Sequence, residues 1–103
     1  MNSERLKMLE QFVEDDPSDP FNHYALALEL VKVDKNQAKR IFDRLMVEHR
    51  TYIATYYQAA ILYLEAALID EATKIIEQGI GEARKQNNPK AVSELKSLLD
   101  EIE

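Results

Sequence analysis

The sequence of 103 residues contains no cysteine, which excludes two kinds of stabilising site. Without cysteine, neither a disulfide framework nor a thiolate metal site can form. Glycine and proline are also scarce, with two and three residues, so few positions interrupt regular backbone and long helices are expected. The lack of cysteine is compatible with a cytoplasmic location, which we expect for this chain.

The sequence also lacks the patterns by which proteins bind nucleic acids or enter membranes. Its formal net charge is -6, and no stretch combines basic residues with interleaved aromatic ones, so we expect no nucleic-acid partner. No run of about 18 apolar residues occurs, and the region from Met1 to Asp16 has no signal-peptide core, so we expect no membrane partner. Hydrophobic residues make up 46% and charged residues 31%, which is typical of one folded, helix-rich domain, here predicted over residues 1–103.

Local signals mark the boundaries of four helices. Two dipeptides of a capping residue and proline, at 19–20 and 88–89, predict helix starts, because the side chain accepts backbone N–H groups and proline fits the first turn. Asp34 followed by Gln37 predicts another start. Apolar residues at helical spacing follow each start and also fill the segment before the first proline. The predicted helices cover residues 3–15, 20–33, 34–48 and 89–102.

The segment from Tyr52 to Arg84 is harder to divide. Helical spacing continues through it and its first glycine is Gly79, so periodicity alone would make one helix of implausible length for a globular domain. The acidic pair Asp70-Glu71 suggests a second helix start, because carboxylates favour the first turn of a helix. Local signals therefore suggest a break near residues 67–70, and an internal repeat supplies the main argument for it.

An offset of about 33–34 residues aligns the sequence with itself and places small residues over small ones and large over large. The spacing of these positions resembles that of the tetratricopeptide repeat, a pair of antiparallel helices. The matching positions are His23, Leu26, Ala27, Leu30, Ala38 and Phe42 in the first repeat, and Tyr56, Ala59, Ala60, Tyr63, Ala72 and Ile76 in the second. The sequence departs from the family's pattern by lacking tryptophan and by having Arg50 and Arg84 at the proline position.

This resemblance implies an all-α fold, a right-handed superhelical stack of antiparallel helix pairs with about six helices. Residues 3–15 are then a half-repeat or cap, the repeats cover about 19–51 and about 52–86, and residues 89–102 form a C-terminal capping helix. Helices approach closely only where side chains are small, so we expect Gly79 to let the C-terminal helix pack near the second repeat. The alternative is a glycine that the helix merely tolerates.

No group of residues predicts catalysis, and we expect neither an enzyme nor a cofactor or metal site. The acidic cluster at residues 14–16 lacks the alternating carboxylates and the glycine of a calcium loop, so we interpret it as solvated. His23 and His49 do not form a metal-binding histidine pair, and His23 occupies a large-residue repeat position, which favours a structural role.

In the family that the sequence resembles, the first helix of each repeat lines a concave groove. The positions carried over to this chain are Phe21, Tyr24, Leu28, Val31, Lys32, Tyr57, Gln58, Ile61, Leu64 and Glu65. They are unusually apolar for a solvent-facing surface, which is typical of an interaction site. We therefore predict a non-catalytic protein-interaction module that binds an apolar or amphipathic peptide segment in this groove. The alternative is a homo-oligomeric structural or scaffold subunit that buries the same surface against a second copy.

Overall fold

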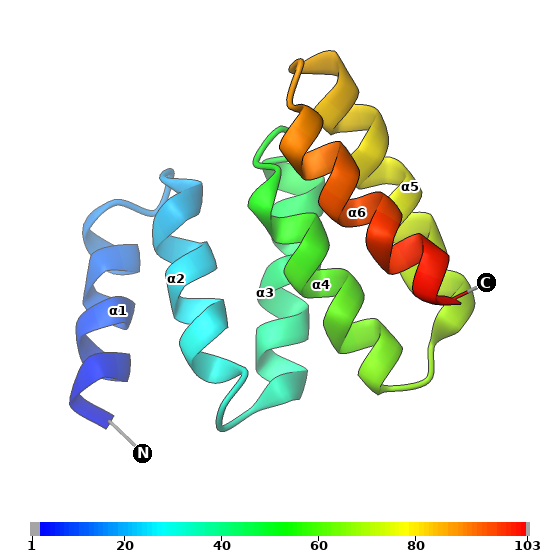
Figure 1. Cartoon of the computed structure of the whole chain (residues 1–103). Coiled ribbons are helices and arrows are strands. Elements are labelled where there is room, and N and C mark those ends of the chain that lie inside the picture. The colour runs from blue at the N-terminus through cyan, green and yellow to red at the C-terminus, as the bar shows by residue number, and fades with distance from the viewer. Residues whose placement is uncertain (1–2, 103) are drawn as a thin grey trace. The chain divides into compact units, whose positions relative to one another are not determined.

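The computed structural model describes residues 3–102, which form six α-helices and no strand (Figure 1). The helices are α1 (Ser3–Asp15), α2 (Pro20–Leu30), α3 (Lys35–Glu48), α4 (Ala54–Glu65), α5 (Ile69–Lys85) and α6 (Pro89–Ile102). The prediction of an all-α fold with about six helices is confirmed. Met1, Asn2 and Glu103 belong to the predicted domain but lie outside the described residues. None of the helices in the described part is both long enough and apolar enough to cross a bilayer.

The helices form two compact units. The first ends at His49, and in it α2 packs against both α1 and α3. The second begins at Arg50, and in it α5 packs against both α4 and α6. Each unit therefore contains one of the helix pairs that the repeat predicts, α2 with α3 and α4 with α5, together with one further helix.

The repeat positions occupy the interior of these units. All twelve are buried except His23 and Tyr63, which are half-buried. Four of the five alanines among them, Ala27, Ala38, Ala60 and Ala72, have no exposed surface, and Ala59 is 1% exposed. Small side chains at these places allow the paired helices to approach closely, and the large side chains fill the remaining space.

The predicted helix starts have the expected chemistry. The Asp19 carboxylate accepts a hydrogen bond from the Phe21 N–H at 2.9 Å, and Asp34 accepts one from the Gln37 N–H at 3.1 Å. At the start of α6 the Asn88 side-chain oxygen accepts one from the Ala91 N–H at 3.1 Å. Each bond satisfies a donor that the first turn of a helix leaves without a partner.

The second helix is shorter than predicted, because it ends at Leu30 rather than near residue 33. The N–H groups of Val33 and Asp34 both bond to the Leu30 carbonyl, at 2.9 and 2.7 Å, and close a tight turn. Asp34 has φ -151° and ψ 84°, outside the helical range, as its role as N-cap of α3 requires. The cap of the following helix therefore determines where α2 stops.

The break between α4 and α5 lies at Ala67, which has φ 62° although it is not glycine. The Leu68 N–H bonds to the Tyr63 carbonyl at 2.9 Å, and the Ala67 N–H bonds to the Leu64 carbonyl at 3.0 Å. These two bonds form a Schellman motif, which normally has glycine at the left-handed position. The same motif follows α5 with Asn87 at φ 53°, so both helices of the second pair end in the same way.

Replacing Ala67 with glycine is expected to stabilise the chain. A left-handed conformation costs a residue with a Cβ atom about 1–2 kcal/mol, which glycine avoids. The greater freedom of glycine in the unfolded chain offsets about 0.5–1 kcal/mol of this stabilisation. Thermal melting followed by circular dichroism should show a midpoint a few degrees higher. The matched control is Ala66→Gly, one residue earlier at φ -86°, which should lower the midpoint. If both variants shift the midpoint in the same direction, the turn does not have the strain assigned to it.

Candidate functional site

The ten residues of the predicted groove all retain contact with solvent. Phe21, Lys32, Tyr57 and Glu65 are exposed, and the other six are half-buried. Eight of the ten lie in α2 or α4, as the resemblance implies. Val31 and Lys32 differ, since Val31 caps the C-terminus of α2 and Lys32 lies in the turn that follows. The predicted positions thus form two accessible strips, one in each unit.

In the first unit the aromatic residues of the strip differ in how firmly they are held. Phe21, in the first turn of α2, is 57% exposed. The Tyr24 ring packs on the buried Phe42 ring of α3, with centroids 6.1 Å apart and a 57° angle between the planes. Tilted rings at this separation attract each other, so Phe42 fixes the orientation of Tyr24. Tyr24 therefore serves helix packing as well as offering an accessible edge.

Lys32 belongs to a charge network rather than to an apolar surface. Its ammonium lies 3.3 Å from the Glu29 carboxylate, which also pairs with Arg5 of α1 at 3.1 Å. Partial burial by itself raises the pKa of Glu29, but the hydrogen bonds and charges of Lys32 and Arg5 outweigh it and hold that pKa below its usual value. Glu29 therefore stays ionised at neutral pH and links α1 to α2. Lys32 is already partly engaged within its own unit.

In the second unit Tyr57 lines a cavity of about 220 Å³ between α4 and α6. Tyr57 is 36% exposed and is the only one of the ten predicted groove residues in the lining. The remaining lining residues are Ile53, Ala54, Asn88, Lys90, Ala91, Glu94 and Leu95. The walls are thus mainly apolar, with one cation and one carboxylate among them. A predicted groove position and a concave surface therefore coincide at Tyr57.

The part of this cavity that comes from α6 was not predicted from the sequence. A capping role was the only one predicted for residues 89–102, although Ala91 and Leu95 lie one helical turn apart on one face. Their i, i+4 spacing was the available signal. What the spacing could not give was which face of α6 lies against α4.

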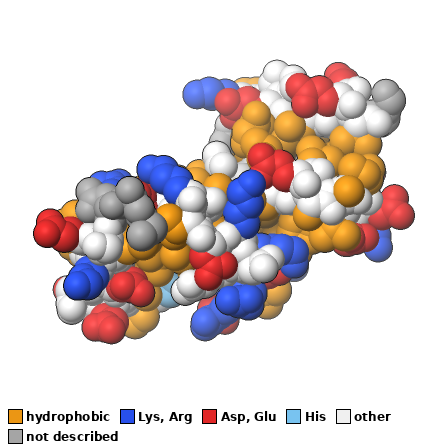
Figure 2. All heavy atoms as spheres, turned by 90° about the horizontal axis from the view of Figure 1, so that it is seen from below, with side chains coloured by type: hydrophobic (Ala, Val, Ile, Leu, Met, Phe, Trp, Pro, Cys, Tyr) orange, Lys and Arg blue, Asp and Glu red, His pale blue; other side chains and the backbone are white. Residues whose placement is uncertain are grey.

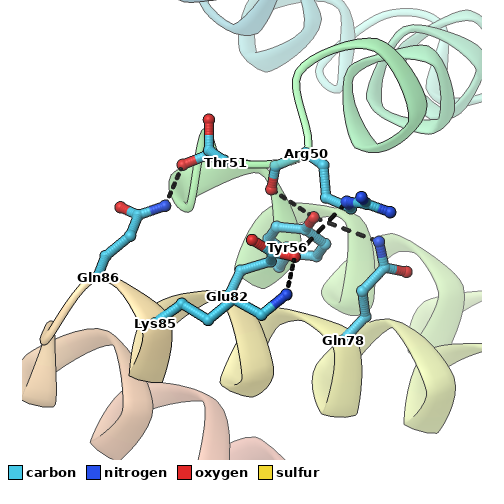
Figure 3. Close-up of polar contacts among 7 residues, drawn as sticks. All are labelled: Arg50, Thr51, Tyr56, Gln78, Glu82, Lys85 and Gln86. Carbon is cyan, nitrogen blue, oxygen red and sulfur yellow. Dashed lines mark hydrogen bonds and ion pairs between the residues drawn. The ribbon is translucent and has the colours of Figure 1, made fainter.

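A cluster of polar contacts anchors the helix that carries Tyr57 (Figure 3). The neighbouring Tyr56 is fully buried, and its hydroxyl donates to the Arg50 carbonyl at 2.6 Å and accepts from the Gln78 amide of α5 at 3.3 Å. Burial raises the pKa of Tyr56, and the nearby Glu82 carboxylate raises it further, against smaller opposing effects of Gln78 and Arg50. The phenol is therefore a neutral donor that fixes the chain just before α4.

Two further contacts connect the same segment to α5. The Glu82 carboxylate, only 7% exposed as a residue, lies 3.6 Å from the Arg50 guanidinium and 3.5 Å from the Lys85 ammonium. The Gln86 amide donates to the Thr51 carbonyl at 2.8 Å. Figure 3 shows these side chains reaching from α5 and its C-terminal end toward the segment that precedes α4. These contacts fix the position of α4. The Glu82 carboxylate is paired with the Arg50 and Lys85 cations and does not point into a cavity.

The two histidines, distant in sequence, line a common pocket of only about 30 Å³ in the first unit, together with Arg44 and Glu48. The His23 ring nitrogen Nε2 lies 2.7 Å from the Pro17 carbonyl, so Nε2 carries the proton and donates. This proximity of His23 and His49 was not predicted from the sequence. Within residues 3–102 no group of three or more histidine, cysteine, aspartate or glutamate side chains has the geometry to hold a metal ion.

Apolar surface is exposed on both units. The exposed large apolar residues include Met8, Phe12 and Phe21 in the first unit and Leu68 and Ile69 in the second. Figure 2 shows one face of the molecule, with hydrophobic side chains gathered on the second unit, at the right, between charged and polar ones. Contiguous apolar surface of this kind is typical of a protein that contacts other proteins.

Comparison with solved structures identifies the family. A tetratricopeptide repeat domain protein from Salinibacter ruber, solved by NMR in solution, is 37% identical and has a TM-score of 0.81, over 85% of this chain and 90% of that one. A crystal structure of a tetratricopeptide repeat domain protein from the same organism is 35% identical with a TM-score of 0.77, over 82% and 94% of the two chains. No protein-family model matches the chain, and no curated protein does. The chain belongs to the tetratricopeptide repeat family, whose helical repeats generally serve as protein-interaction modules.

Proposed function

We propose that the chain is a non-catalytic interaction module that binds an apolar or amphipathic peptide segment, with Tyr57 as the main anchor. The observation that carries the proposal is the 220 Å³ cavity beside Tyr57. Its apolar walls, including Ile53 and Leu95, suit a large apolar side chain of the peptide. Lys90 and Glu94, of opposite charge, line the same cavity and offer a donor and an acceptor that fix the peptide's position.

A rigid tyrosine at the wall of a cavity is a favourable anchor, because its large ring loses little conformational entropy on binding. The helix that carries it is held at its start by the Tyr56 hydroxyl and by Glu82, so the cavity is formed before the peptide arrives. A preformed site lowers the cost of ordering on binding. In the first unit, Phe21, Tyr24 and Leu28 offer a second apolar surface, which we propose as a peptide contact of that unit alone.

Replacing Tyr57 with alanine is expected to weaken peptide binding by about 30-fold or more, the effect of losing a binding hot spot of about 2 kcal/mol. The probes are peptides selected on the wild-type chain from a displayed random library, and fluorescence anisotropy measures their dissociation constants. Ala54→Trp should also block binding, because it adds bulk at the wall of the cavity without removing a contact. The matched control is Ala66→Trp. Like Ala54, Ala66 is exposed in the wild type, but it does not line the cavity. Equal affinity for the wild type, Tyr57→Ala and Ala54→Trp would exclude this site.

Self-assembly over the same surface is the alternative, and it predicts a different result. A homo-oligomer dissociates on dilution, which light scattering over a concentration series detects. If the chain is a dimer that Tyr57→Ala converts to a monomer, the surface serves self-association and peptide binding is not its function. A monomer over the whole series supports the peptide site.

A further inference from the structure

A second concave surface lies along α6, on the side opposite the Tyr57 cavity. This α6 groove has a volume of about 760 Å³ and is lined by the last turn of α5, by the following loop and by residues of α6 from Pro89 to Asp100. The residues of α6 in its lining are offset by almost half a helical turn from those beside Tyr57. The two surfaces share Asn88 in the loop before α6 but no residue of α6, so substitutions in α6 can test them separately.

The charge of the α6 groove is unlike that of the whole chain. Although the net charge is -6, the segment from residue 83 to residue 99 has four lysines or arginines and a single carboxylate, that of Glu94. Glu94 lines the Tyr57 cavity and not this groove. Arg84 and Lys96 line the groove, and neither is paired with a carboxylate among residues 3–102. Asp100, at the far end, is the one acidic residue in the lining.

The form of the groove suits a helix. Its lining follows α6 over residues 89–100, a length of about 17 Å at the helical rise per residue. Ser93 and Ser97, one turn apart, are small and exposed, so another helix can approach the α6 backbone closely, with Val92 as an apolar contact. The chain already packs helices in this manner, since α3 lies on α2 in the first unit and α5 on α4 in the second.

We propose that the α6 groove binds an acidic amphipathic helix of a partner protein. Carboxylates of the partner pair with Arg84 and Lys96, and an apolar side chain covers Val92 between them. The partner is acidic because the two cations in the groove have no carboxylate of their own and outnumber Asp100. This inference does not depend on the Tyr57 cavity and survives if that site fails its own test.

The test uses a displayed library of random peptides about as long as α6, which suffices for a helix spanning the groove. Peptides selected on the wild-type chain should include a class rich in aspartate and glutamate with apolar residues one helical turn apart. Arg84→Glu/Lys96→Glu should lower the affinity of this class by about tenfold or more, since two attractive contacts become repulsive. The affinity for the wild type should also fall as ionic strength rises.

The control variant is Lys7→Glu/Lys74→Glu, which makes the same change in net charge at two exposed positions outside the groove. It should keep the acidic peptides within about twofold, because neither residue lines the groove and exposed charges outside a contact are screened by salt. Tyr57→Ala should retain them too. The proposal is overturned if no acidic class of peptides is selected, or if the control variant weakens binding as much as the groove variant does. It is also overturned if an oligothymidylate binds as tightly as the peptides and loses affinity in the groove variant, because the site would then bind nucleic acid.

Discussion

Replacing Gly79 with alanine is expected to lower the free energy of unfolding by about 1–3 kcal/mol, against the usual preference of helices for alanine. A Cβ atom at Gly79 would lie 2.7 Å from the Tyr56 Cβ atom and 3.0 Å from the Leu95 Cδ1 atom. The Tyr56 Cβ atom is attached directly to the α4 backbone, so it cannot move without displacing that helix. Gly79→Leu should cost more, because its longer side chain meets the same atoms.

Gly81→Ala is the matched control for this prediction. Gly81 lies in the same helix two residues later, and a Cβ atom there would have no neighbour within 4 Å. The substitution should therefore raise the free energy of unfolding by up to about 1 kcal/mol through helix propensity alone. Urea titration of both variants measures the difference. Equal stabilisation by the two alanines would mean that α5 does not approach α4 as closely as the structure has it.

Phe42→Ala is expected to cost about 3–5 kcal/mol, the largest effect of a single side chain in the first unit. Phe42 has no exposed surface and is among the largest of the fully buried side chains. Its loss would leave a cavity between α2 and α3 and remove the ring on which Tyr24 packs. A cost of this size is a large part of the stability of a small domain, so much of the variant should be unfolded at 37 °C.

Phe21→Ala serves as the control for this loss, with the same change of side chain in the same unit. Because Phe21 is 57% exposed, its replacement should change the free energy of unfolding by no more than about 0.5 kcal/mol. Urea titration of the two variants again provides the measurement. A comparable cost at both positions would contradict the assignment of Phe42 to the core and of Phe21 to the accessible surface.

Most of the fold could be predicted from the sequence, because the signals that define it are local or repeated. The caps at Asp19, Asp34 and Asn88 act within three residues of themselves, so the chain itself displays them. The division of residues 52–86 was different, since alanine at position 67 gives no sign of a left-handed turn. The acidic pair Asp70-Glu71 gave a weak local indication, and the spacing of Ala60 and Ala72 in the repeat supplied the main argument. The exact end of α2 depended on a competition between neighbouring segments that periodicity does not resolve.

The candidate site could be predicted only in part. The positions on α2 and α4 follow from the family resemblance, and all ten residues are exposed or half-buried, while their role in binding stays a prediction. The family resemblance implies that Lys32 lies in the groove, but its contact with Glu29 depends on where the turn after α2 brings its side chain. Neither the contribution of Ala91 and Leu95 beside Tyr57 nor the α6 groove could be foreseen, since both depend on which faces of α6 remain uncovered.

The ultraviolet absorbance of the Tyr56 phenol can report whether the second unit is folded. The chain has no tryptophan, so its near-ultraviolet absorbance comes mainly from five tyrosines. The neutral Tyr56 phenol donates to a backbone carbonyl, and its pKa is raised by burial. The stability that it contributes is therefore fully present below the ordinary pKa of tyrosine, falls as the pH rises above that value, and is lost by the raised pKa. Phenolate absorbance that appears at a higher pH than that of an ordinary tyrosine would report, without any label, that the Tyr56 phenol remains buried in its contact with Gln78 of α5.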